Sequence, residues 1–248
     1  MTRYVLIVAL LLSACSGPFG GKPRTPPHKF GDKGDLVDFN YSWSAEASAI
    51  PALEQRFRAI LDKAWREELA AALQDRAQAA AAKREYGGHQ FAFEWNTAGQ
   101  SRRLLSLEGL SSTLTGDRHP NHGTGALLWD RRSGTAIAPS ALLAVPSRLS
   151  ALVHTDFCKG LDRERAKRRA MVPRGAPARP CPAIGNVTLV PSDTNANRRF
   201  DSLRLTADPE VAGSFDEGVY LVVLPVTARF VAALKPLYRS SFEVAQPQ

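Results

Sequence analysis

Cys15 stands where bacterial lipoproteins are cleaved and modified with lipid. A short start containing Arg3 leads into an almost unbroken apolar run at residues 4–12, which the small residues Ser13 and Ala14 follow. The run is shorter than the roughly 20 residues that a membrane-spanning helix needs, and its length and flanks are those of a signal peptide. We predict a signal peptide over residues 1–14 and lipidation of Cys15. The alternatives are an ordinary signal peptide with a coincidental cysteine, or a buried helix.

The lipid on Cys15 would place the protein in the bacterial cell envelope, facing the periplasm. One buried acyl chain holds a protein weakly, so stable anchoring takes two or more chains. Ser16 follows the cysteine, and the absence of an aspartate there favours the outer membrane over the inner one. The membrane is therefore the first predicted partner, and this location argues against nucleic acid despite the net charge of +8.

Cys158 and Cys181 are the two cysteines that remain after Cys15. In an oxidising compartment an even pair predicts a disulfide. Closing this loop would contribute about 3 kcal/mol when chain entropy alone is counted. The alternative is two free thiols, one of them buried. The sequence lacks the Cys-x-x-Cys pattern of a redox site and the four closely grouped ligands of a structural zinc site.

His119 and His122 lie on a predicted loop at residues 116–125, beside Asn121. Loops between strands commonly hold functional residues, so His119, Asn121 and His122 are candidates for ligand binding. The alternative is that His119 and Asn121 form hydrogen bonds that fix the loop while His122 is solvated.

A metal site is another interpretation of the same histidines. His119 and His122 would supply two imidazoles, and Asp117, or His154 and Asp156 brought in by folding, would complete the ligands. The spacing is not that of His-Glu-x-x-His, in which two imidazoles project from one helix face. We therefore expect no metal and keep His119 and His122 as the ligands of this alternative.

A basic segment carries nearly all of the excess charge. Between Lys159 and Arg179 there are eight basic residues and two acidic ones. Such a segment could attract anionic lipid headgroups, lipopolysaccharide or phosphate-bearing wall polymers. The alternative is a solvated helix face with local ion pairs. The candidate contacts are Arg163, Arg165, Lys167, Arg168 and Arg169.

Several kinds of enzyme site are missing from the sequence. There is no Gly-x-Ser-x-Gly nucleophile motif, and no glycine-rich loop of the phosphate- or dinucleotide-binding types. Glu94, Glu108 and Asp130 are scattered along predicted strands, so no carboxylate pair for glycoside cleavage can be assigned. We assign no catalytic residue and expect no cofactor.

Hydrophobic spacing predicts the elements that would position these residues. Residues 15–35 are rich in glycine, proline and lysine and are predicted to be a flexible tether. Residues 37–43 alternate as a strand does. A helix is predicted from Pro51, with Ser48 as its cap, to about residue 83. Its apolar stripe consists of Leu53, Phe57, Ile60, Leu61, Ala64, Trp65, Ala72 and Leu73.

The remainder is predicted to contain strands, then short helices, then strands. The order indicates an α+β fold: a mainly antiparallel sheet packed against one long amphipathic helix and several short helices. We predict a single domain over residues 36–248, with two subdomains, 36–138 and 139–248, as the alternative. Turns are predicted at 98–99 and 132–134, strands at 90–96, 103–114, 125–131, 187–190, 200–205 and 219–224, and helices at 141–144, 147–157, 162–170 and 229–234.

The order of elements and three local patterns resemble a known family. This is the extracytoplasmic domain of unknown function found in the anti-sigma factor RsiV and, as a non-catalytic domain, in the peptidoglycan deacetylase PdaC. The first pattern is a strand entering a helix, the second a His-containing loop followed by a strand and a glycine turn, and the third a C-terminal strand. They read Phe39-Asn-Tyr-Ser-Trp43 with Ile50-Pro-Ala-Leu53; Gly116-Asp-Arg-His-Pro-Asn-His-Gly123 with Leu127-Leu-Trp-Asp-Arg-Arg-Ser-Gly134; and Phe215-Asp-Glu-Gly-Val-Tyr-Leu-Val-Val-Leu-Pro-Val226.

The resemblance implies a module that recognises cell-wall material or an envelope protein. We expect a lipid-anchored, non-enzymatic binding or sensing protein whose partner is peptidoglycan, lipopolysaccharide or an envelope protein. One alternative is a metal-dependent hydrolase or deacetylase that modifies peptidoglycan. The other is a structural protein of envelope assembly.

Overall fold

The computed structural model describes residues 25–116, 119–168 and 179–246. The strands are β1 (His28–Lys33), β2 (Val37–Trp43), β3 (His89–Gln100), β4 (Leu104–Thr115), β5 (Asn121–Asp130), β6 (Thr135–Ile137), β7 (Thr188–Ser192), β8 (Ser202–Ala207) and β9 (Tyr220–Pro225). The α-helices are α1 (Ala45–Ser48), α2 (Pro51–Ala81), α3 (Leu149–Arg168), α4 (Ala228–Ala233) and α5 (Pro236–Arg239). Short 3₁₀ turns lie at η1 (Pro139–Leu142), η2 (Pro146–Arg148), η3 (Ile184–Asn186) and η4 (Phe215–Glu217).

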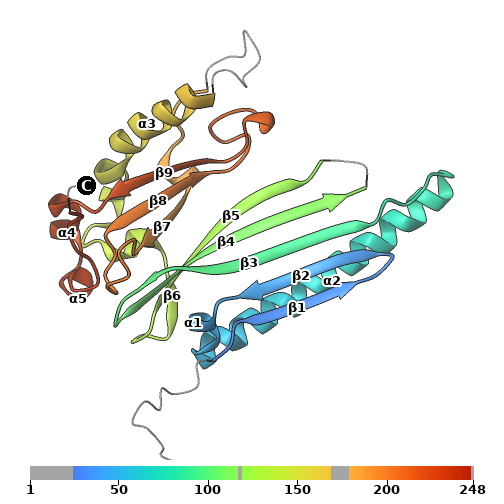
Figure 1. Ribbon diagram of the computed structural model, residues 1–248, viewed down its shortest axis with the longest axis horizontal. Coiled ribbons are helices and arrows are strands. Elements are labelled where there is room, and N and C mark those ends of the chain that lie inside the picture. The colour runs from blue at the N-terminus through green and yellow to red at the C-terminus, as the bar shows by residue number, and fades with distance from the viewer. Residues whose placement is uncertain (1–24, 117–118, 169–178, 247–248) are drawn as a thin grey trace, which may run out of the picture.

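Strands β1 to β6 form a six-stranded sheet in chain order, and β7 to β9 form a separate three-stranded sheet (Figure 1). Every pairing is antiparallel except that of β2 with β3, which is parallel. The long helix α2 makes that exception possible, because parallel neighbours need a long crossover connection. The predicted α+β class with a mainly antiparallel sheet is confirmed.

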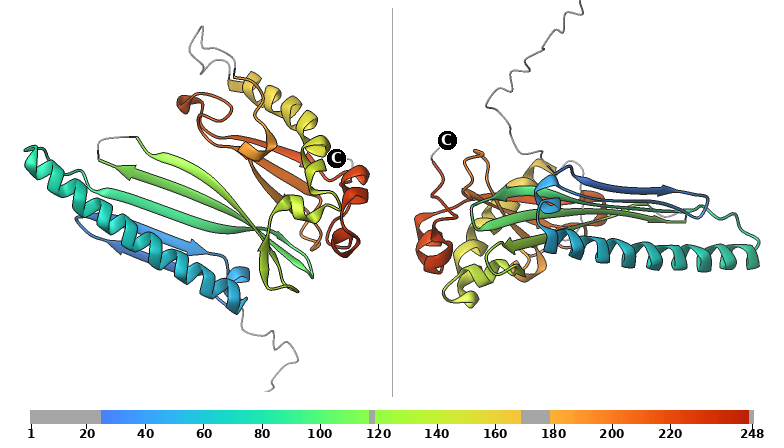
Figure 2. Two further views of the ribbon diagram at one scale, coloured as in Figure 1. Left: turned by 180° about the vertical axis from the view of Figure 1, so that it is seen from behind. Right: turned by 90° about the horizontal axis from the view of Figure 1, so that it is seen from below.

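Helix α2 lies along one face of the six-stranded sheet (Figure 2). Alternate residues of β2 point toward it and are buried, while its own Leu53, Phe57 and Leu61 complete the core. Leu73, predicted on the same stripe, is 51% exposed. Ser48 ends α1 rather than capping α2, whose N-cap is Ile50. The residues of β2 in this core are Val37, Phe39, Tyr41 and Trp43.

A second hydrophobic core lies between α3 and the three-stranded sheet, and α4 and α5 close its end. Phe157 and Leu161 of α3 are fully buried in it. Gly160 lets the helix approach β9 closely, since a Cβ there would lie 2.4 Å from Cγ1 of Val222. The two cores are thus built mainly from different parts of the chain, although Leu104 and Leu128 of the first sheet belong to the second core.

The folded part begins before the point predicted from the sequence. Residues 28–33, predicted as tether, pair with β2 as strand β1. His28 stacks on Trp43 with ring centroids 3.8 Å apart, and Phe30 meets Trp65 edge-on. These two aromatic contacts stabilise a strand whose glycine and lysine content is typical of a linker. The predicted tether therefore ends before His28, and residues 1–24 lie outside the described part of the chain.

The turn predicted at Ala98 and Gly99 is wrong, because both residues lie inside β3. The strand register shifts between Thr97 and Gly99, which marks a β-bulge. A Cβ on Gly99 would lie 2.7 Å from the backbone nitrogen of Asp193, so this glycine allows the three-stranded sheet to approach. The turn between β3 and β4 falls at residues 101–103 instead.

Candidate binding site

The face of the six-stranded sheet opposite α2 is only partly covered by the three-stranded sheet. Arg204 of β8 forms an ion pair with Glu108 of β4, with 3.3 Å between nitrogen and oxygen. Asp193 donates its backbone N–H to the carbonyl of Ala98 at 3.1 Å. Farther along the strands this face is open, and its exposed side chains include Asn40, Ala92, Glu94, Leu110 and His122.

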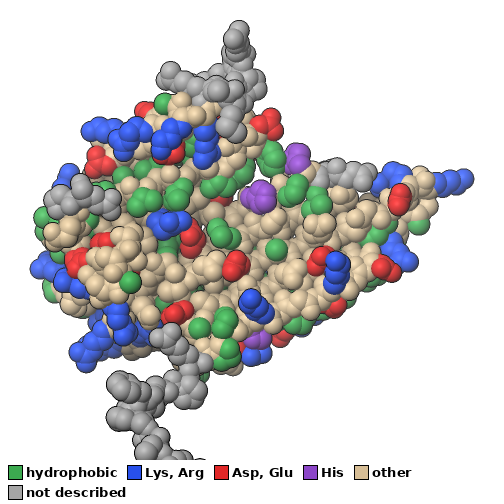
Figure 3. All heavy atoms as spheres, in the orientation of Figure 1, with side chains coloured by type: hydrophobic (Ala, Val, Ile, Leu, Met, Phe, Trp, Pro, Cys, Tyr) green, Lys and Arg blue, Asp and Glu red, His purple; other side chains and the backbone are tan. Residues whose placement is uncertain are grey.

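A shallow groove of about 440 Å³ crosses the open face over β1 to β5. We call it the sheet-face groove. Leu110 is 43% exposed, and it is the large apolar residue of the lining whose side chain is open to solvent; Phe30, Tyr41 and Phe93 line the groove but are less exposed. Figure 3 shows this face as mostly polar and backbone surface with scattered charges and with histidine beside the hollow that separates it from the smaller sheet. The polar side chains of the lining include Lys29, Asn40, Ser42, Glu94, Ser112 and His122.

Of the two loop histidines, the structure places only His122 in the sheet-face groove. The predicted loop at 116–125 is shorter than expected, because β5 begins at Asn121 and His122 pairs with Ser112 of β4. Asn121 is exposed at the start of β5. The ring of His119 packs against that of Phe215 of η4 in a tilted arrangement, with ring centroids 4.0 Å apart. Asp117, the third residue of the metal alternative, lies outside the described residues.

The β4–β5 hairpin is joined to the smaller sheet at a second point. Asp208 accepts hydrogen bonds from the backbone N–H and the hydroxyl of Thr124, at 3.0 and 2.8 Å. Thr188 of β7 donates to the carbonyl of Thr124 at 3.3 Å. These contacts occupy the free edge of β5 and hold the hairpin beside the groove.

The turn that carries Phe215 is itself fixed by Glu217. The Glu217 carboxylate accepts from the backbone N–H and hydroxyl of Ser214 and from the hydroxyl of Tyr220. Burial raises the pKa of Glu217, but the hydrogen bonds from Tyr220 and Ser214 outweigh it and hold that pKa below its usual range. Burial and the neighbouring carboxylate raise the pKa of Tyr220 to about 12. The pair therefore stays a carboxylate and a neutral phenol over the physiological range.

Two of the predicted basic contacts are used inside the fold. Arg165 donates to the carbonyls of Ala212 and Pro180. Arg168 donates to the carbonyls of Glu217 and Val219 at 2.7 and 2.8 Å, and its guanidinium lies over a tyrosine ring. Both side chains satisfy backbone acceptors that helix and strand pairing leave free, so we leave them out of the proposed site.

The other basic candidates are dispersed. Lys167 forms an exposed ion pair with Glu164 at 2.6 Å. Arg163 lines a separate groove between α3 and β9. Arg169 lies outside the described residues. The structure therefore does not gather the described members of this segment into one binding surface with the histidines.

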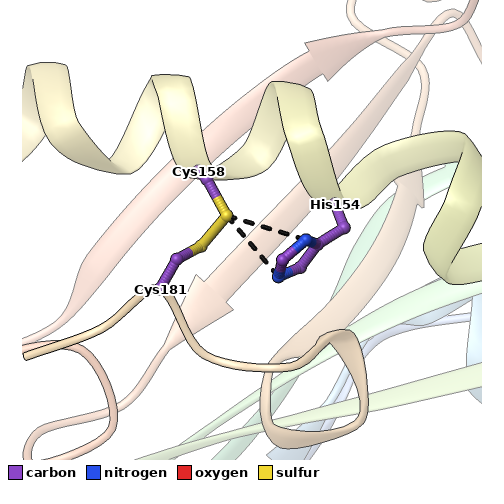
Figure 4. A group of neighbouring side chains, drawn as sticks. All are labelled: His154, Cys158 and Cys181. Atoms are coloured by element: carbon purple, nitrogen blue, oxygen red, sulfur yellow. Dashed lines mark hydrogen bonds between the residues drawn. A yellow bond between two sulfur atoms is a disulfide. The ribbon is translucent and has the colours of Figure 1, made fainter.

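The disulfide between Cys158 and Cys181 is confirmed, with the two Cα atoms 5.6 Å apart. His154 lies one helical turn before Cys158 on α3, and its Nε2 is 3.5 Å from the Cys158 sulfur (Figure 4). Among the described residues, these three are the group whose ligand atoms lie close enough together to hold a metal ion. His119, His122 and Asp156 do not belong to it.

A buried histidine on β3 was missed by the sequence reasoning. Nδ1 of His89 lies 2.7 Å from a carboxylate oxygen of Glu68, and its Nε2 lies 3.0 Å from one of Asp75. Both acids belong to α2 and stand seven residues apart, so they project from the same helix face. The contacts attach the C-terminal half of α2 to β3, next to a hollow of about 420 Å³ lined in part by Tyr86 and Gly116. The seven-residue spacing of the two acids along the predicted helix was the sequence signal that could have indicated this contact.

Solved structures share this arrangement. One is a DUF3298 family protein from Pseudomonas aeruginosa PAO1, with a TM-score of 0.51 and 16% identity over 86% of this chain and 95% of that one. Another is a member of the DUF3298 family from Bacteroides fragilis NCTC 9343, with a TM-score of 0.57 and 11% identity over 87% of this chain and 95% of that one. The fold is that of DUF3298 family proteins. DUF3298 is the domain shared by RsiV and PdaC, so the predicted resemblance is supported at the level of the fold.

Comparisons of the sequence with known families and curated proteins give no match. In the part of the chain that the structure describes, no helix has both the length and the apolar character needed to cross a bilayer.

Proposed function

We propose that this protein is a lipid-anchored, periplasm-facing module of the cell envelope that binds an envelope component in the sheet-face groove without catalysing a reaction. The observation that carries the proposal is the groove itself. Part of a sheet face is left open there, and the exposed apolar side chain of Leu110 lies among amide, hydroxyl and charged groups. Binding sites combine apolar contact area with a few placed polar groups in this way.

The charges of the groove favour peptidoglycan over lipopolysaccharide as the ligand. Lys29 and Glu94 bring one charge of each sign, and Asn40 and Ser112 bring hydrogen-bonding groups. Peptidoglycan offers hydroxyl, amide and carboxylate groups together. A polyanion such as lipopolysaccharide would instead be attracted by a cluster of cations, and Arg165 and Arg168 are not available to form one.

The metal-dependent hydrolase with His119 and His122 as its ligands finds no support among the described residues. His119 contacts Phe215 in the smaller sheet's turn, while His122 lies on the sheet face. Neither belongs to a group of three potential ligands in the described ranges.

Leu110→Asp is expected to weaken binding to purified, insoluble peptidoglycan at least tenfold. The new carboxylate would lie where the ligand covers apolar surface, and a loss of about 1.4 kcal/mol corresponds to that factor. The measurement is a co-sedimentation isotherm with sacculi, together with parallel isotherms for lipopolysaccharide and lysozyme.

Leu73→Asp is the matched control, because Leu73 is similarly exposed but lies on α2, away from the groove. It should bind as the wild type does. Equal binding by wild type and Leu110→Asp would refute the groove as the site, and failure of the wild type to bind any of the three ligands would refute the proposed function.

The anchor is tested at Cys15. Cys15→Ser should abolish incorporation of radiolabelled palmitate and move the protein from the membrane fraction to the soluble fraction, because the thiol that carries the lipid is gone. The double variant Cys158→Ser/Cys181→Ser should keep the label, which separates lipidation from disulfide chemistry. Persistent labelling of Cys15→Ser would show that lipid is attached elsewhere or not by this mechanism.

A further inference from the structure

His154, Cys158 and Cys181 form a cluster that the proposed function does not use. The first two stand four residues apart on one face of α3, and the loop before η3 brings in the third (Figure 4). One ligand atom from each residue lies within 4.8 Å of the others. All three residues are partly exposed, so small solutes have access to them.

The spacing of these atoms fits a tetrahedral zinc site. Zinc binds thiolate sulfur at about 2.3 Å and imidazole nitrogen at about 2.0–2.1 Å. In a tetrahedron these bond lengths put nitrogen and sulfur roughly 3.6 Å apart. Nε2 of His154 is 3.5 Å from the Cys158 sulfur. The two sulfurs are bonded to one another in the structure and would need to separate.

We propose that reduction of the Cys158–Cys181 disulfide converts this cluster into a zinc site. A dithiol reductant supplies two electrons and two protons, the sulfur–sulfur bond breaks into two thiols, and the dithiol becomes a disulfide. Zinc binding then releases both thiol protons and joins two thiolates to the neutral imidazole of His154. Three protein ligands leave the fourth position of the tetrahedron to water.

Contacts other than the disulfide keep Cys181 beside α3 after reduction. Arg165 donates to the carbonyl of Pro180, the residue before Cys181, at 3.3 Å. Pro182 is buried on its other side, and Ile184 belongs to the second core. The Cα atoms of the two cysteines, 5.6 Å apart, need little change for both sulfurs to reach one ion.

Titration with Co²⁺ tests the proposal, because Co²⁺ adopts the same geometry and reports thiolate ligands in its absorption. The protein is reduced with a water-soluble phosphine, which is itself oxidised to the phosphine oxide with water as the oxygen source and adds no competing thiol. We expect one equivalent to bind with thiolate-to-cobalt charge-transfer bands and tetrahedral d–d bands, both of which Zn²⁺ removes. The oxidised protein should show neither band.

Three variants locate the ligands. His154→Ala should weaken the affinity of the reduced protein for Co²⁺ at least tenfold, because loss of even an outer-shell partner of a metal ligand costs about 10–100-fold. Cys158→Ser/Cys181→Ser should abolish both bands. His122→Ala should bind Co²⁺ with the affinity of the wild type. The proposal is overturned if the reduced wild type gives no thiolate band or if His154→Ala keeps full affinity.

Thermal unfolding followed by circular dichroism tests the proposal even if the reduced protein is only loosely folded. Zn²⁺ should raise the melting temperature of the reduced wild type, or restore its fold, and leave the oxidised protein unchanged. A reduced protein that zinc neither stabilises nor refolds also overturns the proposal.

Discussion

Asp130→Asn is expected to lower the free energy of unfolding by about 3 kcal/mol, as breaking a buried charge pair from one side does. The Asp130 side chain is 1% exposed. One of its oxygens accepts from Nε and Nη2 of Arg103 at 3.0 and 2.8 Å, and from the Tyr238 hydroxyl at 3.1 Å. The other accepts from the backbone N–H of Arg132 at 2.9 Å. An amide in this place cannot accept all four bonds and leaves the Arg103 charge without its partner.

The effect is large because Asp130 connects the two parts of the molecule. It ends β5 in the six-stranded sheet, whereas Tyr238 belongs to α5 and to the second core. Loss of this carboxylate therefore weakens the attachment of the C-terminal helices as well as the end of the sheet. Urea unfolding followed by tryptophan fluorescence measures the change.

The pH dependence of the same variant gives an independent check. Burial raises the pKa of Asp130, but its hydrogen bonds with Arg103, Arg132 and Tyr238 outweigh it and hold the pKa below the ordinary value of 3.8. A carboxyl whose pKa is lower in the folded state stabilises the fold above its unfolded pKa, and this contribution is lost as the pH falls through the folded value. The gap between wild type and Asp130→Asn should thus be full at pH 7 and shrink below pH 3.8.

Asp32→Asn is the control, because Asp32 is exposed on β1. Surface changes of this kind usually alter stability by less than about 0.5 kcal/mol. If Asp130→Asn costs no more than Asp32→Asn, the buried carboxylate does not join the two parts as argued.

The elements that could be predicted are those in which the local spacing of apolar residues determines which face is buried. Alternation in β2 and the helical stripe from Leu53 to Leu61 each place one apolar face on one core, so local spacing was sufficient. Gly134 has a φ of 66°, as the predicted hairpin turn requires. The disulfide was predicted from the cysteine count together with the predicted oxidising compartment.

The features that escaped prediction depend on contacts between distant segments. β1 is stabilised by stacking of His28 on Trp43, and Gly99 allows the close approach of Asp193, which follows β7 almost 100 residues later. His122 and Leu110 line the same groove only because β4 and β5 pair in one particular register. Of the proposed zinc ligands, His154 and Cys158 are four residues apart, and Cys181 follows Cys158 by 23 residues. This spacing matches no known sequence signature of a zinc site.

Cys158→Ser/Cys181→Ser is expected to lower the free energy of unfolding by about 3 kcal/mol, because the unfolded chain regains the entropy of an open loop. The contacts of Arg165 and Ile184 remain, so the folded state should keep its structure. A more expanded unfolded chain exposes more surface, and the slope of the unfolding free energy against urea should therefore rise with the loss in stability.

Wild-type protein reduced without metal should unfold as the double serine variant does, since both lack the same covalent link. Added zinc should then make the reduced wild type more stable than the double serine variant, because only the reduced wild type retains the two thiols. A double variant as stable as the oxidised wild type would show that the loop is already closed by non-covalent packing in the unfolded ensemble. A stability loss with an unchanged slope would instead assign the disulfide's effect to the folded state. The two quantities together decide on which side of the folding equilibrium this cross-link acts.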